Sequence, residues 1–393
     1  PWFKYSFQWW LMPYGNDHTA LLASGLGGQR MIVLPELDIV AVFTGWNIYE
    51  IPALNSWMAM NKIINAVDIE MNYFPKLFIL AIYFSILLGI GFFASKRITN
   101  ISDYYVGGKK LGYWIAALSA RSTGESGWLL IGVTGMGALM GVSAMWIVVG
   151  EVIGVFFSWQ FMAKKFKRMT DDYGSITIPD FLVSHFRSST HLIRVLAATA
   201  LSLFVIIYVS AQIDITGKTF ESFLGFNYYT GIAIGFGIVV LYIFSGGFLA
   251  VAWSDFFQGS LMFVGLLVLP IIAFFSLSSD ASIIDGLYSI DPALLDIWGP
   301  GGLNWINFAT VAGLISIGIG FMGSPQVYVR FIAIKSETEV EKGKWVAIFY
   351  TLLTDTAAVM IGIMGRYMLT KAGQDPEAVL GNAGENVLAM LLN

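Results

Sequence analysis

The sequence predicts an all-α polytopic membrane protein of about eight transmembrane helices, preceded by a small α/β segment. Of its 393 residues, 56% are hydrophobic and only 12% are charged, and the mean hydropathy is +0.71. Soluble domains carry about 25% charged residues, so the lipid bilayer is the expected solvent. Crossing a bilayer takes roughly 20 apolar residues. Runs of this kind cover residues 75–94, 113–137, 143–163, 191–216, 229–245, 256–276, 304–323 and 345–369. Buried core helices of a large soluble protein give similar runs, but the mostly short polar connections favour membrane spans.

Charge and cysteine content exclude several classes of function. The net charge of -4 argues against a nucleic-acid partner. The absence of cysteine excludes disulfides and cysteine-ligated metal sites. The chain starts at Pro1, with no signal peptide ahead of its first long apolar run. We therefore expect it to be an internal piece of a longer protein.

Residues 1–67 have a β-rich pattern instead of a membrane pattern. Tyr5–Leu11 is aromatic and strand-like, and Gly25–Gly28 is a glycine-rich turn between strand candidates around Leu21 and at 31–34. A further β-rich run covers 37–44, and 56–67 is a candidate amphipathic helix. The expected organisation is a small segment over 1–67, a junction over 68–74 and the membrane domain over 75–393.

The N-terminal segment resembles the C-terminal end of serine β-lactamase-like hydrolases. The resemblance rests on "YSFQWWL", "ASGLGGQRMIVLPELDIVAVFTG" and the closing helix. That family implies a Ser-x-x-Lys nucleophile motif far upstream, which this chain lacks, and a basic residue where Ala23 precedes Ser24-Gly25. Without a nucleophile there is no basis for acyl transfer. We expect an inert remnant, whether it arose by natural fusion, read-through or artefact.

Orientation follows from the distribution of Lys and Arg. The loops after the first, third and seventh spans are rich in basic residues, whereas 217–228 holds only Lys218 and 277–303 holds none. The positive-inside rule places the basic loops in the cytoplasm and residues 1–74 on the extracytoplasmic side of the cell membrane.

Two spans carry breaks in their helical pattern. In the second span, Ser119–Gly127 is polar and holds two glycines and two opposite charges. In the seventh, three glycines precede Pro325. Tightly packed glycine-rich helices are the alternative, but a pair of interrupted spans favours an inverted-repeat transporter with a binding site at mid-membrane.

Five sequence blocks extend this prediction. "DYYVGGKKLG", "SARSTGESGWLLIGVTG", "GSITIPDFL", "GGFLAVAWSDFFQGSLM" and "GFMGSPQVYVRF" resemble signature blocks of the sodium/solute symporter family, with sodium/proline symporters nearest. The resemblance covers residue 73 to the end. It implies a LeuT-like core of two inverted five-helix repeats behind one extra helix, incomplete in this chain.

The resemblance also implies site residues. Sodium is expected at the backbone carbonyls of Ser122 and Glu125, and an ion pathway at Asp255, for which a helix N-cap at the membrane surface is the alternative. The implied substrate-facing residues are Ser126, Gly127, Trp128, Tyr208, Ile317 and Phe321.

Three departures from the proline carriers affect these expectations. Those carriers have Asp and Met where this chain has Gly124 and Glu125, so the carboxylate is shifted by one residue. They have Trp and Tyr where this chain has Ile317 and Phe321, which leaves proline uncertain as the substrate. The hydroxyls that complete the family's sodium site are expected beyond Asn393, so the site is expected to be half present.

Four of the charged residues within the predicted spans bear on the site. Arg121 and Glu125 are spaced i, i+4, and a mutual ion pair is an alternative to a sodium role for Glu125. Glu151 and Asp355 are each predicted to be satisfied interhelical carboxylates.

The predicted function is sodium-coupled symport of a small organic solute, with an amino acid such as proline as one candidate. The protein is therefore predicted to be a transporter and not an enzyme. Two alternatives remain open: a membrane sensor module of a signalling protein, which a downstream kinase domain would reveal, and a membrane-anchored serine hydrolase, which an upstream Ser-x-x-Lys would support.

Overall fold

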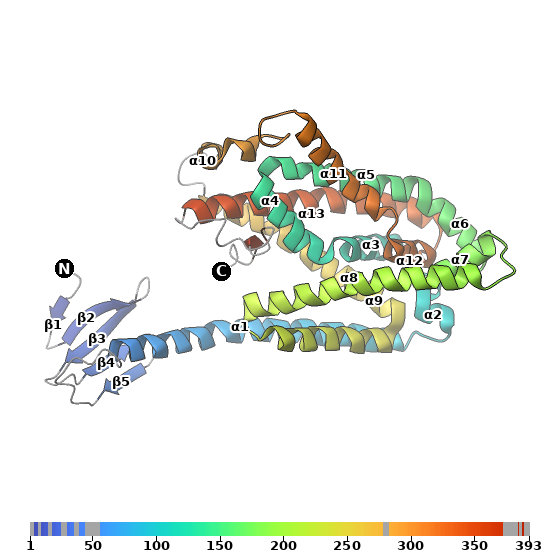
Figure 1. The fold of residues 1–393 in the computed structure, drawn as a ribbon. Coiled ribbons are helices and arrows are strands. Elements are labelled where there is room, and N and C mark those ends of the chain that lie inside the picture. Colours follow the sequence, from blue (N-terminus) through green and yellow to red (C-terminus); the bar gives the residue numbers. More distant parts are fainter. Residues whose placement is uncertain are drawn as a thin grey trace. The chain divides into compact units, whose positions relative to one another are not determined.

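The computed structural model describes residues 56–277 and 283–371 continuously. It also describes the shorter stretches 4–6, 9–14, 18–24, 30–34, 39–43, 384 and 387–388. The chain divides into two compact units, Pro1–Tyr83 and Phe84–Asn393 (Figure 1). The predicted division at 68–74 lies inside a helix that belongs to both units.

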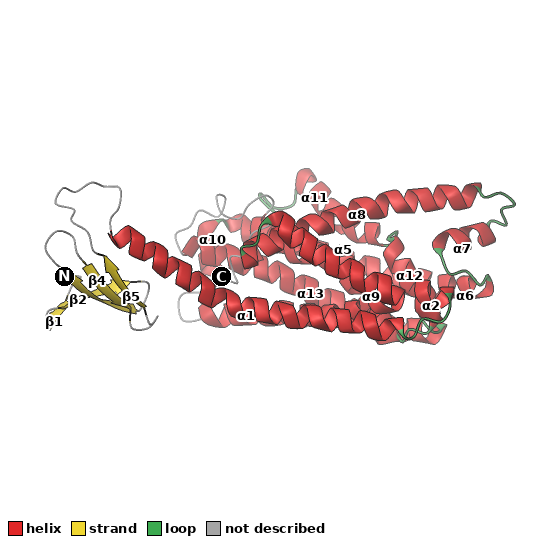
Figure 2. Cartoon of the chain, turned by 90° about the horizontal axis from the view of Figure 1, so that it is seen from below, coloured by secondary structure: helices red, strands yellow, loops and turns green. Residues whose placement is uncertain are grey.

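The first unit contains a five-stranded antiparallel meander, drawn in yellow in Figure 2. Its strands are β1 (Lys4–Ser6), β2 (Trp9–Tyr14), β3 (His18–Ser24), β4 (Arg30–Leu34) and β5 (Ile39–Phe43). The strands predicted around Leu21, at 31–34 and within 37–44 are present. The single strand predicted at Tyr5–Leu11 is wrong, because Ser6 pairs with Trp9 across two antiparallel strands. A run of aromatic residues favours strand throughout and carries no turn signal, which hid this reversal. The predicted glycine turn at 25–28 lies outside the described residues.

Helix α1 (Ser56–Ser95) joins the predicted amphipathic helix and the first predicted span into one element of 40 residues. The junction predicted at 68–74 is therefore helical. It contains neither glycine nor proline, so nothing in its local sequence ends the helix. Pro75 lies inside the helix.

The second unit is a helical membrane bundle (Figures 1 and 2). After α1 its helices are α2 (Ile101–Val106), α3 (Tyr113–Gly127), α4 (Thr134–Met140), α5 (Met145–Phe157), α6 (Lys164–Asp172), α7 (Ile178–His185), α8 (Leu192–Leu224), α9 (Tyr228–Leu277), α10 (Ile283–Ile290), α11 (Trp305–Phe321), α12 (Pro325–Ala333) and α13 (Glu337–Lys371).

The predicted spans are confirmed as apolar helical runs. In the part of the chain that the structure describes, six helical runs are long and apolar enough to cross a membrane, and those at Tyr113–Asp172 and Tyr228–Phe275 span 60 and 48 residues. At 1.5 Å per residue, each of these two is long enough for two crossings. Glycines divide both: Gly141 ends α4 with φ 61°, and Gly247 kinks α9 with φ 52°. Only glycine adopts such angles without steric cost, so these two positions fix where the runs turn.

One end of the bundle is ion-paired. Figure 1 shows α2, α6, α7 and α12 gathered at this end and α10 at the opposite end. Its ion pairs join Lys109 to Asp171 (3.0 Å), Arg168 to Glu337 (2.7 Å) and Lys164 to Glu341 (3.1 Å). Ahead of α2, the Thr99 hydroxyl hydrogen-bonds the Asp103 carboxylate and lowers the pKa of Asp103. The basic residues used to predict orientation therefore lie together in space.

Helices α5 and α11 touch backbone to backbone. A Cβ added at Gly318 would overlap the carbonyl of Gly150, and one added at Gly154 would overlap the carbonyl of Gly318. Small residues spaced four apart permit this approach between membrane helices. The contact fixes the C-terminal half of α11 against α5, close to the second predicted break.

Gly318→Ala should therefore destabilise the bundle by about 1–3 kcal/mol, the usual cost of overpacking. Gly313→Ala on the same helix is the matched control, because a Cβ there meets no atom within 4 Å. It should be neutral, or stabilising by up to about 1 kcal/mol through helix propensity. Thermal unfolding of both variants in detergent measures the difference, and equal effects would contradict the packing described here.

Candidate functional site

The second predicted span breaks at Ser126. This residue has φ 34° and ψ -140° inside α3, and a π-helical turn over Trp128–Val133 follows it. Across the break, the Trp128 backbone N–H donates to the Glu125 carbonyl. A positive φ is strained for a residue with a side chain, so the surrounding contacts must hold this turn open.

Tyr208 of α8 supplies such contacts. Its hydroxyl donates to the Thr123 carbonyl at 2.7 Å. The Ser126 hydroxyl lies 3.0 Å from the Tyr208 oxygen and can donate to it. A backbone carbonyl freed by a break in a membrane helix needs a donor from protein or water. Tyr208 thus stabilises the open turn from a neighbouring helix.

The seventh span also breaks where the sequence predicts. Helix α11 ends at Phe321 and α12 begins at Pro325, with Met322, Gly323 and Ser324 between them. A Cβ placed on Gly124 would lie 3.7 Å from the Phe321 ring. The two interrupted helices therefore meet at their breaks.

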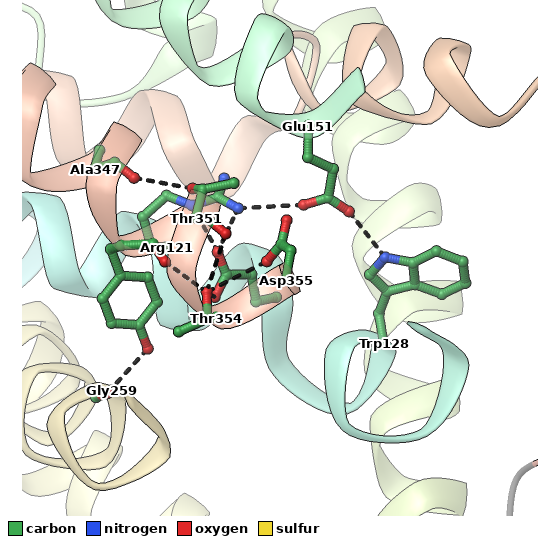
Figure 3. A network of polar contacts seen from close by, with 10 residues as sticks. Arg121, Trp128, Glu151, Gly259, Ala347, Thr351, Thr354 and Asp355 are labelled. Carbon is green, nitrogen blue, oxygen red and sulfur yellow. Dashed lines mark hydrogen bonds and ion pairs between the residues drawn. The ribbon is translucent and has the colours of Figure 1, made fainter. Parts of the chain in front are cut away.

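Buried charges surround the first break (Figure 3). Arg121 Nε donates to Glu125 Oε1 at 2.9 Å, and Arg121 Nη2 pairs with Glu151 Oε2 of α5 at 3.3 Å. Asp355 of α13 completes the group: one carboxylate oxygen from each of Glu125, Glu151 and Asp355 lies within 4.8 Å of the others. All four side chains are buried. Three helices thus place three carboxylates around one guanidinium.

Two neutral groups contact this cluster. The Trp128 indole donates to Glu151 Oε1 at 3.0 Å. The Thr354 hydroxyl lies 3.2 Å from Glu125 Oε2 and 3.3 Å from Asp355 Oδ1, but it is closest to the Tyr350 carbonyl, at 2.7 Å.

The predicted Arg121–Glu125 ion pair is therefore present. Glu151 also has partners, as predicted, whereas Asp355 Oδ2 has none in the described structure. The prediction of a satisfied carboxylate is thus wrong for that atom. Sequence reasoning treated Glu151 and Asp355 separately. Ionisable residues are rare within membrane spans, and this rarity was the signal in the sequence that Glu151 and Asp355 could act together.

A second polar network involves Asp255 of α9. Its Oδ2 accepts from Arg330 Nη2 at 2.7 Å, Ser119 Oγ at 2.6 Å and Thr123 Oγ1 at 3.1 Å. Arg330 lies on α12, so this network ties α12 and α9 to the part of α3 that precedes the break at Ser126. Asp255 lies within α9, eight residues beyond the Gly247 kink, so the alternative that it is a helix N-cap is wrong.

The predicted substrate residues surround the first break without sharing one cavity. Gly127 lines a cavity of about 590 Å³ whose walls are mainly apolar, with Lys218, Thr219 and Glu221 of α8 among its polar residues. The hydroxyls of Ser126 and Tyr208 hydrogen-bond each other. Trp128 and Ile317 pack against the same apolar core cluster, and Phe321 lies beside Gly124.

Of the predicted sodium ligands, Glu125 already accepts one hydrogen bond at its carbonyl, which leaves a second lone pair. The Ser122 hydroxyl donates to the Asp255 carbonyl at 3.2 Å. The two ligand residues lie one turn apart on the same stretch of α3, so their carbonyls are available to one ion only if the turn stays open.

Comparison with known proteins agrees with this geometry. A sequence profile described as "Sodium:solute symporter family" matches residues 104–392. The chain is 37% identical over 306 residues to the high-affinity proline transporter PutP of Bacillus subtilis (strain 168), covering 75% of this chain and 63% of that protein. It is 34% identical over 306 residues to the osmoregulated proline transporter OpuE of the same organism, covering 76% and 61%. It is 32% identical over 288 residues to the sodium/proline symporter of Staphylococcus aureus (strain JH9), covering 73% and 55%.

Among solved structures, the chain is similar to a Na+-coupled sialic acid symporter in a substrate-bound outward-open state. The TM-score is 0.62 at 19% sequence identity, over 79% of this chain and 62% of that one. This likeness shows the fold and confirms the predicted LeuT-like architecture. The chain spans 55 to 63% of the length of the curated relatives named above.

Removing Arg121 should strongly destabilise the bundle. Arg121→Gln leaves buried carboxylates without their cation, which costs about 3–5 kcal/mol in buried ion pairs. Lys218→Gln is the control, because Lys218 pairs with Asp214 where both side chains are 47% exposed, and such pairs contribute about 0.3–0.5 kcal/mol. Thermal unfolding in detergent separates the two. A loss at Arg121 no larger than at Lys218 would show that the cluster has another source of positive charge.

Proposed function

The chain belongs to the sodium:solute symporter family, and from this premise we propose that it carries binding elements of a sodium-coupled symporter for a small organic solute. It is a multi-pass membrane protein. The observation that carries the proposal is the approach of the two interrupted helices, because Phe321, the last residue of α11, lies beside Gly124, two residues before the break at Ser126. Interrupted helices present backbone carbonyls to a cation and backbone N–H groups to an anionic solute group.

In this proposal sodium binds at the carbonyls of Ser122 and Glu125. Sodium is a hard cation that takes oxygen ligands, and a carbonyl provides one whatever its side chain. The solute binds on the other side of the turn, near Ser126, Gly127 and Trp128, with Tyr208 from α8 and Ile317 and Phe321 from α11. The 590 Å³ cavity at Gly127 is large enough for a small solute and has Thr219 and Glu221 on its wall for polar groups of the solute.

An amino acid is the first solute class to test, since the relatives named above are proline transporters and symporters. Two side chains of this protein favour a different preference among amino acids from that of the proline carriers. Ile317 brings no ring to the site, and Phe321 brings a ring without a hydroxyl. We therefore propose that proline is recognised less tightly than in carriers with Trp and Tyr at these positions.

Asp255 is proposed to lie on the sodium pathway, below the binding site. In the structure its carboxylate is occupied by Arg330, Ser119 and Thr123. Sodium passage there requires the Arg330 contact to open, so this ion pair would act as a closure between α9 and α12.

The proposed orientation places the end of the bundle with α2, α6, α7 and α12 in the cytoplasm. The basic loops after the first, third and seventh spans meet at that end (Figure 1). Residues 1–74 then lie on the extracytoplasmic side of the cell membrane. We propose no catalysis for them, since the segment contains no Ser-x-x-Lys.

Uptake into vesicles tests the transport proposal. The complete transporter that contains this chain, reconstituted in proteoliposomes, should accumulate a labelled amino acid when an inward sodium gradient is imposed, and should not do so with choline replacing sodium. In competition with a panel of amino and organic acids, proline should not win by a wide margin. Ile317→Trp combined with Phe321→Tyr should raise the preference for proline several-fold. A strong proline preference before substitution would refute the proposed change in recognition.

Cysteine labelling tests the orientation, since the chain has no native cysteine. Ser189→Cys and Ser289→Cys place single thiols at exposed positions near opposite ends of the bundle. An impermeant thiol reagent added outside intact cells should label only the cysteine at 289, and lysis should expose the one at 189. Labelling of both from one side would be incompatible with the proposed topology.

A further inference from the structure

The cluster of Glu125, Glu151 and Asp355 has more negative than positive charge. Arg121 is the cation that forms ion pairs with it in the described structure, and it contacts Glu125 and Glu151. With all three carboxylates ionised, two negative charges remain without a counter-charge. The three residues are at most 1% exposed. Buried charge at this density is stable only with a compensating cation or proton.

The hydrogen bonds of the cluster leave three carboxylate oxygens without a strong donor. Arg121 and the Trp128 indole occupy one oxygen of Glu125 and both oxygens of Glu151. Glu125 Oε2 and Asp355 Oδ1 share the single proton of the Thr354 hydroxyl, which lies closer to the Tyr350 carbonyl. Asp355 Oδ2 is buried with no partner in the described structure. In Figure 3 the Asp355 carboxylate lies between Thr354 and Glu151, among the other charged groups.

The spacing of these oxygens suits a bound ion. One oxygen from each carboxylate lies within 4.8 Å of the other two. A single point is then no more than about 2.8 Å from all three, close to the 2.3–2.6 Å of oxygen ligands around Ca²⁺, an ion of nearly the radius of sodium. One oxygen from each carboxylate and the Thr354 hydroxyl make about four protein ligands, fewer than the six to eight that Ca²⁺ takes. This favours a monovalent ion.

We propose that Glu125, Glu151 and Asp355 form a side-chain site for sodium between α3, α5 and α13, separate from the backbone carbonyls of the break. The identity of the ion rests on the proposed function, whereas the existence of the site rests on the geometry above. Because Glu125 belongs to the broken helix, an ion here stabilises the open turn directly. Arg121 then has a positioning role, holding two of the three carboxylates at the spacing that the ion requires.

Direct binding of ²²Na⁺ to the purified protein tests this site. Asp355→Asn removes the charge of the unpartnered carboxylate and keeps its shape, so it should lower sodium affinity at least tenfold. Asp214→Asn is the matched control on α8, where the carboxylate is half-exposed and paired with Lys218, and it should change affinity less than twofold. Unchanged affinity in Asp355→Asn, or absence of sodium binding to the unsubstituted protein, would overturn the proposal. Displacement of sodium by micromolar calcium would also overturn it.

Thermal unfolding shows whether the variant is folded and gives a second measurement. Sodium chloride, but not choline chloride, should raise the Tm of the unsubstituted protein, because a ligand that binds only the folded state stabilises it. Asp355→Asn should have an equal or higher Tm without sodium, since an uncompensated buried charge is removed, and should show no sodium-dependent rise. If this variant does not fold, Glu151→Gln should likewise show no sodium-dependent rise, although its own Tm should fall because the amide NH2 replaces an oxygen that accepts a hydrogen bond. An equal sodium-dependent rise in the folded variant and in the unsubstituted protein would refute the site.

The outcomes for this site and for transport are separable. Sodium binding that depends on Asp355, without sodium-driven uptake of any solute, would support this site and reject the proposed function. Sodium-driven uptake with sodium binding unaffected by Asp355→Asn would support the function and reject this site.

Discussion

One buried arginine organises the centre of this molecule. Arg121 lies on the helix that breaks, and its guanidinium holds a carboxylate of the same helix and one of α5. Asp355 brings α13 to the same point. Charge is costly in a membrane interior, so these three helices are stable only in the arrangement that brings the cation and the carboxylates together. The position of α3 relative to α5 and α13 therefore depends on this cluster, and so does the location of the break.

The break is held by groups on several sides. From α8, Tyr208 hydrogen-bonds the Thr123 carbonyl and the Ser126 hydroxyl. From α12 and α9, Arg330 and Asp255 bind each other and the hydroxyls of Ser119 and Thr123 on α3. The glycine contact between α5 and α11 fixes the second interrupted helix close by. A rigid frame around one open turn keeps backbone groups available for ligands, because the strain at Ser126 is offset by contacts elsewhere.

The family fold and the local chemistry carry different information. The fold is shared with a solved symporter at only 19% identity, so it tolerates wide change in side chains. The buried charges depend on side chains: Glu125 on the broken helix has Arg121, Glu151 and Asp355 as neighbours. These side chains set the distribution of charge beside the open turn.

Much of this protein was determined by sequence alone. Composition and apolar runs predicted the membrane helices, because the bilayer imposes length and polarity on every span. Glycine, serine and proline predicted both breaks, because backbone propensity is local. Local patterns missed the reversal between Ser6 and Trp9 and the continuity of α1 through 68–74. They also treated Glu151 and Asp355 as separate satisfied residues and allowed Asp255 to be a surface cap. Only the tertiary structure decided these roles, because residues 30 to 230 positions apart come together through helix packing, and a buried charge depends on which neighbours that packing supplies.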